Sequence, residues 1–129
     1  MKASVELTEK PIAEMALLRS RALPRDAGAV VCFVGSVRDS EPDGPISGLE
    51  YEAFAPMAEH QFRRLLETIS GKWPIVSVRV VHRVGRVGPG EPSVWVEVIA
   101  PHRQEAFEAC QWLIEEMKRG VPIWKKPLR

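Results

Sequence analysis

The feature that most constrains the fold is a pair of segments with valine at alternate positions, residues 76–80 and residues 94–98. Consecutive side chains of a β-strand point to opposite faces. Each segment therefore turns its valines to one face and the residues between them, such as Trp95 and Glu97, to the other. Gly88-Pro89-Gly90 lies between the two segments and is typical of a tight connection. The pattern predicts a long antiparallel hairpin with one apolar face.

Three further strands are predicted from composition and alternation. Residues 28–37 (GAVVCFVGSV) are rich in β-branched side chains, which indicates a largely buried strand that ends at Arg38. Residues 49–54 (LEYEAF) alternate as a shorter strand, and residues 5–7 form another near the start. Residues 40–45 contain little but turn formers and acids, so a mobile loop is expected there.

Three segments are predicted to be helical. The first opens at Thr8 with Pro11 in its first turn, the second begins at Pro56, and the third begins at residues 101–103 and closes at Gly120. The spacing of apolar residues places the following positions of the last two helices in the core: Ala58, Phe62, Leu65, Leu66 and Ile69, then Ala106, Phe107, Cys110, Leu113, Ile114 and Met117. Helices packed on antiparallel hairpins predict an α+β fold, with residues 1–129 in a single domain.

Composition and charge exclude several classes of function. The formal net charge is +1, so bulk charge does not predict nucleic-acid or membrane binding. The longest apolar run, residues 29–34, is far too short to span a bilayer, and the first residues lack the apolar stretch of a signal peptide. Cys32 and Cys110 lie in apolar segments, which indicates reduced core thiols in a cytoplasmic protein. Three scattered histidines do not predict a metal site.

Basic side chains gather where the predicted elements end, and such ends present binding groups from a rigid scaffold. Arg38 ends a strand, and His102 and Arg103 begin the last helix, whose free N–H groups suit an anion. Lys118 lies at the other end of that helix, and Lys125-Lys126 follow a short extended segment. These residues are candidates for holding a phosphate or carboxylate. Lys118 is equally explained as a partner of the helix dipole, and the lysine pair as a solubilising tail.

Lys118 and His102 cannot both reach one small ligand within the same chain. Sixteen positions separate them along one predicted helix, which corresponds to roughly 24 Å. Either the ligand is extended or a second subunit brings the two helix ends together. The spacing therefore favours a homodimer with a shared site.

Taken in order along the chain, several segments resemble a known family. They are residues 28–38 (GAVVCFVGSVR), 49–52 (LEYE) with 56–59 (PMAE), 82–85 (HRVG) with 88–91 (GPGE), 102–103 (HR) with 106–109 (AFEA), and Lys118 with 121–126 (VPIWKK). The family is the molybdopterin synthase catalytic, or large, subunit. The resemblance extends from Gly28 to Lys126.

This resemblance implies a fold, a reaction and a partner. Family members have an α/β-hammerhead-type fold and convert cyclic pyranopterin monophosphate (precursor Z) to molybdopterin by installing a dithiolene. Each sulfur arrives as a thiocarboxylate at the C-terminal Gly-Gly of a small ubiquitin-like subunit, whose tail inserts into the large subunit. The implied assembly is a heterotetramer with a central homodimer of large subunits. No cofactor is expected, and neither cysteine is required because the partner carries the sulfur.

The resemblance also implies a set of site residues. Those expected to surround substrate are Ser36, Val37, Arg38, His102, Arg103, Lys118, Lys125, Lys126 and Pro127. Arg38, His102 and Arg103 would clamp the phosphate and the pterin. Lys118 and Lys125 would be the catalytic pair. They would lie nearest the thiocarboxylate and stabilise charge or donate protons while oxygen is displaced.

Two departures from the family pattern leave other functions open. Pro127 stands where the family commonly has an acidic residue, and the sequence ends at Arg129 where family chains usually continue. Part of the pocket wall is therefore expected to be missing or supplied differently. One alternative is a non-catalytic relative that binds the pterin phosphate or the small subunit without turnover. Another is an RNA-binding protein that uses the basic tail with Trp124 and Tyr51, which the near-neutral charge and the few aromatic residues disfavour.

Overall fold

The computed structural model describes residues 1–129 and contains strands and three helices in mixed order. Along the chain the elements are β1 (Lys2–Thr8), α1 (Glu14–Arg19), β2 (Ala29–Ser36), β3 (Ser40–Glu41), β4 (Gly44–Pro45), β5 (Gly48–Ala53), α2 (Ala55–Lys72), β6 (Ser77–Arg83), β7 (Gly85–Val87), β8 (Pro92–Ala100), α3 (Arg103–Gly120) and β9 (Ile123–Leu128). None of the helices combines the length and the apolar character that crossing a bilayer requires.

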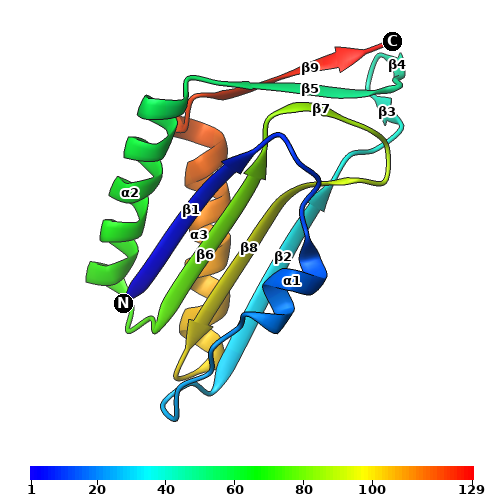
Figure 1. Cartoon of the computed structure of the whole chain (residues 1–129). Helices are drawn as coiled ribbons and strands as arrows, with labels where there is room; N and C mark the ends of the chain where they lie inside the picture. Colours follow the sequence, from blue (N-terminus) through cyan, green and yellow to red (C-terminus); the bar gives the residue numbers. More distant parts are fainter.

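The central element is a four-stranded sheet in the order β1-β6-β8-β2 (Figure 1). Strands β6 and β8 form the predicted antiparallel hairpin, with Val78 opposite Val98 and Val80 opposite Val96. The valines of both strands therefore lie on one face, as their alternation predicted. Strand β1 adds to β6 in parallel, and β2 adds to β8 in the antiparallel direction.

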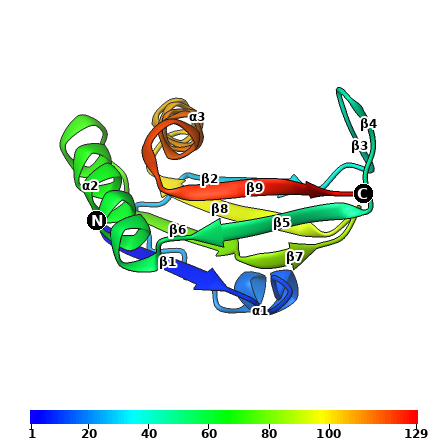
Figure 2. The same ribbon diagram turned by 90° about the horizontal axis from the view of Figure 1, so that it is seen from above.

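Helices α2 and α3 cover the valine face of this sheet, and α1 lies on the opposite face (Figure 2). The buried residues of the two long helices are Ala58, Phe62, Leu66 and Ile69 of α2, and Ala106, Ala109, Cys110, Leu113 and Met117 of α3. Burying a side chain the size of Leu113 contributes about 1.5–3 kcal/mol. The predicted stripes are confirmed except at Phe107, which is 61% exposed. Ala106 is buried as predicted, and Ala109, which was not among the predicted positions, is buried as well.

The opposite face of the sheet carries a charged cluster beneath the segment that contains α1. The Glu97 carboxylate is 1% exposed and accepts hydrogen bonds from Arg21 Nε at 2.7 Å and from Arg79 Nε at 2.7 Å. The Arg79 guanidinium also donates to the carbonyl of Leu17 at 2.9 Å and lies over the Trp95 ring, 5.1 Å from its centroid. These contacts attach the chain around α1 to the sheet.

The first helix begins later than predicted. Thr8 is still part of β1, where it pairs with Arg83, and its hydroxyl accepts a hydrogen bond from the Lys10 backbone at 3.1 Å. Helix α1 starts only at Glu14, because the parallel pairing with β6 holds the chain extended to residue 8. Ile12, which precedes the helix, is the residue that packs against the sheet, beside Trp95.

Strand β2 is not largely buried, contrary to the prediction. It lies at the edge of the sheet, none of its residues is fully buried, and Cys32 is exposed. A run of β-branched residues gives no information on which strand ends a sheet, because edge position depends on long-range pairing. The prediction of a core thiol is therefore wrong for Cys32 and correct for Cys110.

A second sheet, in the order β7-β5-β9, lies across one end of the first (Figure 1). Its strands are antiparallel, with Tyr51 of β5 opposite Lys125 of β9 and Gly85 of β7. Residues 40–45, predicted as a loop, form the short β3–β4 hairpin, which projects on the same side of the molecule as α3 (Figure 2). Gly44 at its turn has a φ of 129°, which favours glycine. The α+β class, with antiparallel hairpins and packed helices, is confirmed.

Candidate active site

The two sheets and the end of α3 enclose a hollow of about 510 Å³. Its lining comes from the end of β2 and the residues after it, the β3 hairpin, β5, β6, β8, α3 and β9. The lining residues are Phe33, Gly35, Ser36, Val37, Arg38, Glu41, Leu49, Tyr51, His82, Ser93, Val94, Met117, Lys118, Ile123 and Lys125. Five of the residues predicted around substrate are among them. They come from two distant parts of the sequence, residues 36–38 and residues 118–125, which the fold brings together.

Ser36 and Arg38 reach the hollow because strand β2 ends in an irregularity. The pairing of β2 with β8 shifts register between Gly35 and Ser36, a bulge that turns the strand away from its neighbour. Val37 is 4% exposed and packs in a small core with Leu49 and Val87, while its backbone bonds to that of Glu91 at 3.0 Å. With Val37 held inward, the side chains on either side of it remain exposed at the rim.

Lys118 and Lys125 come together because the chain reverses after α3. Met117 is buried and its carbonyl accepts a hydrogen bond from the Val121 backbone at 3.2 Å, which closes the helix in the turn that carries Lys118. Strand β9 then runs back along β5. Ile123 and Lys125, two positions apart, both line the hollow, as expected of residues on one face of a strand. The helix end and the strand thus present one lysine each to the same space.

Positive charge in this hollow exceeds negative charge. Arg38, Lys118 and Lys125 line it together with one carboxylate, that of Glu41, which lies 3.9 Å from Lys125 Nζ. Arg38 and Lys118 form no ion pair in the chain. Cations that converge on a concave surface without matching acids attract and hold anionic ligands. The arrangement suits a ligand that carries a phosphate, a carboxylate or a thiocarboxylate.

Four polar lining residues were not predicted as site residues: Glu41, Tyr51, His82 and Ser93. Glu41 was assigned to a loop, and Tyr51 was considered only as an RNA contact. His82 was interpreted as structural. The alternation of β6 could have indicated His82, because it lies on the same face as Val78 and Val80 at the end where the sheet meets the hollow. Burial lowers the pKa of His82, and its hydrogen bond to the Arg83 carbonyl offsets that effect only in part.

Four predicted site residues lie outside the hollow. His102 and Arg103 are exposed at the opposite end of α3, where the Glu105 carboxylate accepts a hydrogen bond from the His102 backbone at 2.8 Å. Lys126 and Pro127 continue β9 and are exposed, but neither lines the hollow. A role for these four residues in holding substrate stays a prediction.

Neither cysteine has the surroundings of an activated nucleophile. The pKa of Cys110 is raised to about 11 by its burial. Burial also raises the pKa of Cys32, although that residue is exposed by surface area, and the nearby carboxylates of Glu97 and Glu14 add to the effect while Arg21 and Arg79 oppose it. A thiol with a raised pKa is a poor nucleophile at neutral pH.

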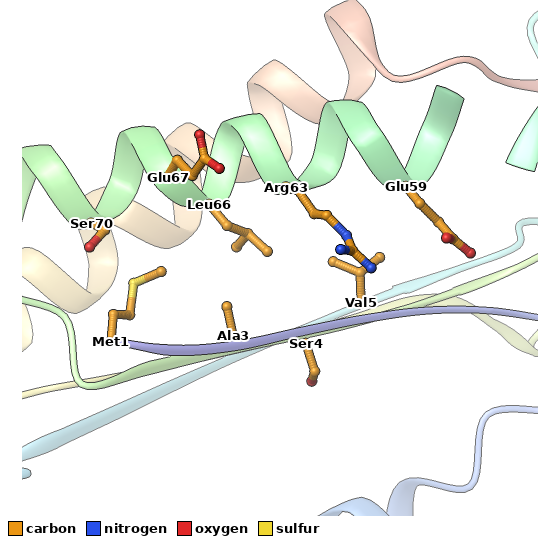
Figure 3. A pocket seen from close by; sticks show the side chains of 9 residues that line it. All are labelled: Met1, Ala3, Ser4, Val5, Glu59, Arg63, Leu66, Glu67 and Ser70. Atoms are coloured by element: carbon orange, nitrogen blue, oxygen red, sulfur yellow. The ribbon is translucent and has the colours of Figure 1, made fainter. Parts of the chain in front are cut away.

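A second hollow, of about 600 Å³, lies between β1 and α2. Figure 3 shows Arg63 reaching from α2 toward Val5 of β1, with Glu59 and Glu67 on the same helix. Here the single basic lining residue is accompanied by two carboxylates. This hollow is slightly larger, but its carboxylates outnumber its basic side chain and none of the predicted site residues lines it. We therefore place the candidate site at the end of α3.

Comparison with known proteins identifies the family. The family model described as MoaE protein matches residues 7–120. The chain belongs to the MoaE family. Other members include a molybdopterin synthase catalytic subunit of Thermoplasma volcanium, 42% identical over 96% of this chain and 90% of that protein. The corresponding subunit of Bacillus subtilis is 37% identical over 95% of this chain and 78% of its own length.

Solved MoaE-family structures share the fold described here. The molybdopterin synthase of Staphylococcus aureus superposes with a TM-score of 0.86 at 36% identity, covering 95% of this chain and 89% of that one. A complex of subunits 1 and 2 of molybdopterin-converting factor from Helicobacter pylori gives a TM-score of 0.81 at 25% identity, covering 95% and 83%. The predicted family and the predicted class of enzyme, a sulfurtransferase, are confirmed.

Proposed function

We propose that this chain converts cyclic pyranopterin monophosphate to molybdopterin, with sulfur taken from the C-terminal thiocarboxylate of a small ubiquitin-like subunit. The observation that carries the proposal is the hollow at the end of α3, where three cations face one carboxylate. Both reactants are anions, one a phosphate ester and the other a thiocarboxylate. A site with excess positive charge holds both and reduces the repulsion between them.

The positions of the cations suggest a division of roles. Arg38 is held at the rim by the inward packing of Val37, and its planar guanidinium suits a phosphate oxygen pair, with the Ser36 hydroxyl beside it. Lys118 and Lys125 lie on the α3 and β9 side, where they would flank the thiocarboxylate. Their ammonium groups would stabilise charge on the oxygen that departs and supply protons to it.

We also propose that the working enzyme is a homodimer bound to two small subunits. His102 and Arg103 lie at the far end of α3 from Lys118, a distance of roughly 24 Å for sixteen residues of helix. They can serve the same substrate only if a second copy supplies them. A two-fold dimer would place the start of one α3 near the end of the other and would complete two equivalent sites.

A mixing experiment tests the shared site. Lys118→Ala and Arg103→Ala are each expected to be inactive, but in a mixed dimer one site carries both changes and the other carries neither. After subunit exchange of equal amounts, about one quarter of all sites should be intact, since a symmetric dimer forms two equivalent sites. Recovery of turnover supports a shared site. No recovery, with exchange verified by mass spectrometry, contradicts it.

We place the enzyme in the cytoplasm. Both cysteines are free thiols, and Cys32 is exposed to solvent. An exposed thiol of this kind persists in a reducing compartment. Fractionation of cells that express the untagged chain tests this proposal, and recovery outside the cytoplasm contradicts it.

The decisive test of the proposed function is a single-turnover assay. The purified chain is mixed with precursor Z and thiocarboxylated small subunit, and molybdopterin is detected after oxidation to a fluorescent pterin. Product formation is expected. A folded dimer that binds the small subunit and makes no product would instead identify a non-catalytic relative, the alternative suggested by Pro127.

A further inference from the structure

His82 lies where the dry core of the sheet gives way to the candidate site. Val78 and Val80 precede it on the same face of β6 and are fully buried under the helices. His82 follows on that face at the end of the strand, 7% exposed, and lines the hollow with Lys118 and Lys125. It is the only histidine there.

One hydrogen bond settles which nitrogen of this imidazole carries the proton. His82 Nδ1 lies 2.7 Å from the carbonyl oxygen of Arg83. A carbonyl can only accept, so Nδ1 is the protonated nitrogen and Nε2 of the neutral ring carries a lone pair. Nε2 has no hydrogen-bond partner in the chain and is not sealed from solvent. The ring therefore offers a free proton acceptor.

The ring is also held in position. The Tyr51 ring contacts it edge to face, with centroids 5.3 Å apart and an interplanar angle of 75°. Tyr51 is the cross-strand partner of Lys125. A side chain fixed by a hydrogen bond and an aromatic contact loses little freedom when it acts on a ligand, which is the requirement for a catalytic group on a rigid scaffold.

The groups around His82 favour its neutral form. Lys118 of α3, Lys125 of β9 and Arg38 after β2 face the same hollow and oppose a further positive charge. Glu41 of the β3 hairpin acts in the other direction, but it lies beside Lys125. The neighbouring Arg83 bonds to the backbone carbonyls of Glu9 and Arg86 and is also a cation. Burial of the ring lowers the His82 pKa, and the hydrogen bond to the Arg83 carbonyl acts against it.

We propose that His82 is a general base that activates water for release of the spent small subunit. This inference rests on the proposed function. Once the thiocarboxylate sulfur has bonded to a pterin carbon, that sulfur links the pterin to the carbonyl carbon of the small subunit. A water oxygen attacks this carbonyl carbon while Nε2 takes a proton from the water. The carbon–sulfur bond breaks, its electron pair stays on the pterin sulfur, and the small subunit leaves with an ordinary carboxyl group.

Lys118 and Lys125 cannot accept this proton in the ammonium form in which they stabilise charge and donate protons. As ammonium groups they donate protons and stabilise oxyanions, but they have no lone pair to accept one. A neutral imidazole beside them supplies the missing acceptor. The hollow then holds proton donors for the addition of sulfur and a proton acceptor for the release of the small subunit.

The test separates release from sulfur addition. His82→Asn keeps a donor near Nδ1 for the Arg83 carbonyl and removes the Nε2 acceptor. In single turnover, the variant should still form the covalent link between the small subunit and the pterin, seen by intact mass of the small subunit. Release should slow about 100-fold, the lower range for loss of a general base. Release in the wild type should fall as acid protonates Nε2, and this dependence should vanish in the variant.

Two outcomes would overturn the inference without touching the proposed function. One is an active wild type whose His82→Asn variant releases the small subunit at the same rate and with the same pH profile. The other, which applies even if the variant does not fold, is a wild-type release rate that stays constant from neutral pH down to the lowest pH at which the protein remains folded, because a histidine with a lowered pKa titrates on the acid side of its usual range. A wild type that forms neither the link nor the product contradicts the proposed function itself.

Discussion

Two clusters of charged residues in this chain differ in how their charges are balanced. On the outer face of the sheet, one buried carboxylate, Glu97, is bound by two guanidinium groups, those of Arg79 and Arg21, at 2.7 Å each. In the hollow at the end of α3, the three cations Arg38, Lys118 and Lys125 are accompanied by one carboxylate. That carboxylate, of Glu41, lies 3.9 Å from Lys125 Nζ. The buried charge of the first cluster is paired within the chain, whereas the second cluster has more cations than carboxylates.

This difference indicates what each cluster does. A buried carboxylate that accepts short hydrogen bonds from two arginines stabilises the fold, and removal of one partner leaves a buried charge unpaired. Cations that gather without acids cost some stability through mutual repulsion and gain their partners only when an anion binds. We therefore expect changes in the first cluster to alter stability and changes in the second to alter turnover.

Lys118→Ala is the change with the largest expected effect. Loss of one group that stabilises developing charge lowers the rate by about 100- to 1,000-fold. The side chain is exposed at a helix end, so the free energy of unfolding should change by less than about 0.5 kcal/mol. Single-turnover assays and urea unfolding measure the two quantities. Turnover like that of the wild type would remove Lys118 from the mechanism.

Glu97→Gln should have the opposite profile. The substitution preserves shape but removes the charge that Arg79 and Arg21 bind, and we expect a loss of about 2–3 kcal/mol in the free energy of unfolding. Turnover at a temperature where the variant is folded should match the wild type, because Glu97 does not line the hollow. A variant that is stable and inactive would break the distinction between the two clusters.

The same carboxylate makes stability depend on pH. Burial alone would raise the pKa of Glu97, but the hydrogen bonds from Arg79 and Arg21 outweigh it and the pKa is lowered. A folded pKa below the unfolded value means that the folded chain binds fewer protons, so the contribution is complete above the unfolded pKa. It is lost as the pH falls through the folded pKa. The gap in urea midpoint between wild type and Glu97→Gln should be full at neutral pH and shrink in acid. A gap that does not change contradicts this linkage.

The smallest effect is expected at the β3–β4 hairpin, which carries Glu41. Arg129 donates to the Pro45 carbonyl at 3.2 Å and forms an ion pair with Asp43 at the surface. Exposed pairs of this kind contribute about 0–1 kcal/mol. Arg129→Ala should leave stability and turnover close to the wild type while hydrogen exchange at residues 40–45 becomes faster. Exchange that does not change would show that Arg129 does not order the hairpin.

The features of the fold that could be predicted from the sequence are those that the local spacing of residues determines. Alternating valines predicted the β6–β8 hairpin, since the period of a strand is two residues. The stripe of α3 was predicted except at Phe107, which is exposed, and at Ala109, which is buried, because the assignment followed hydrophobicity at positions where helix geometry decides. The exposure of Cys32 could not be predicted, because the edge position of β2 depends on pairings far apart in the chain.

Only part of the candidate site could be predicted from local sequence spacing. Each basic residue could be placed at the end of an element, but their meeting depends on β9 running back along β5 and on the bulge that ends β2. The grouping of these residues into one site was predicted from the resemblance to a family, because no local pattern relates Arg38 to Lys125. His82 was missed because its role depends on what lies at the end of the sheet, which strand alternation does not reveal.

The most direct test of the central claim compares Lys125→Ala with Lys126→Ala. The two lysines have the same charge and are both exposed on β9, but only Lys125 lines the hollow. In the single-turnover assay, Lys125→Ala should lose most of the rate, by about 100-fold, while Lys126→Ala stays within a few-fold of the wild type. Equal losses would show that the net charge of the tail matters and that the unmatched cations of the hollow do not form the reaction site.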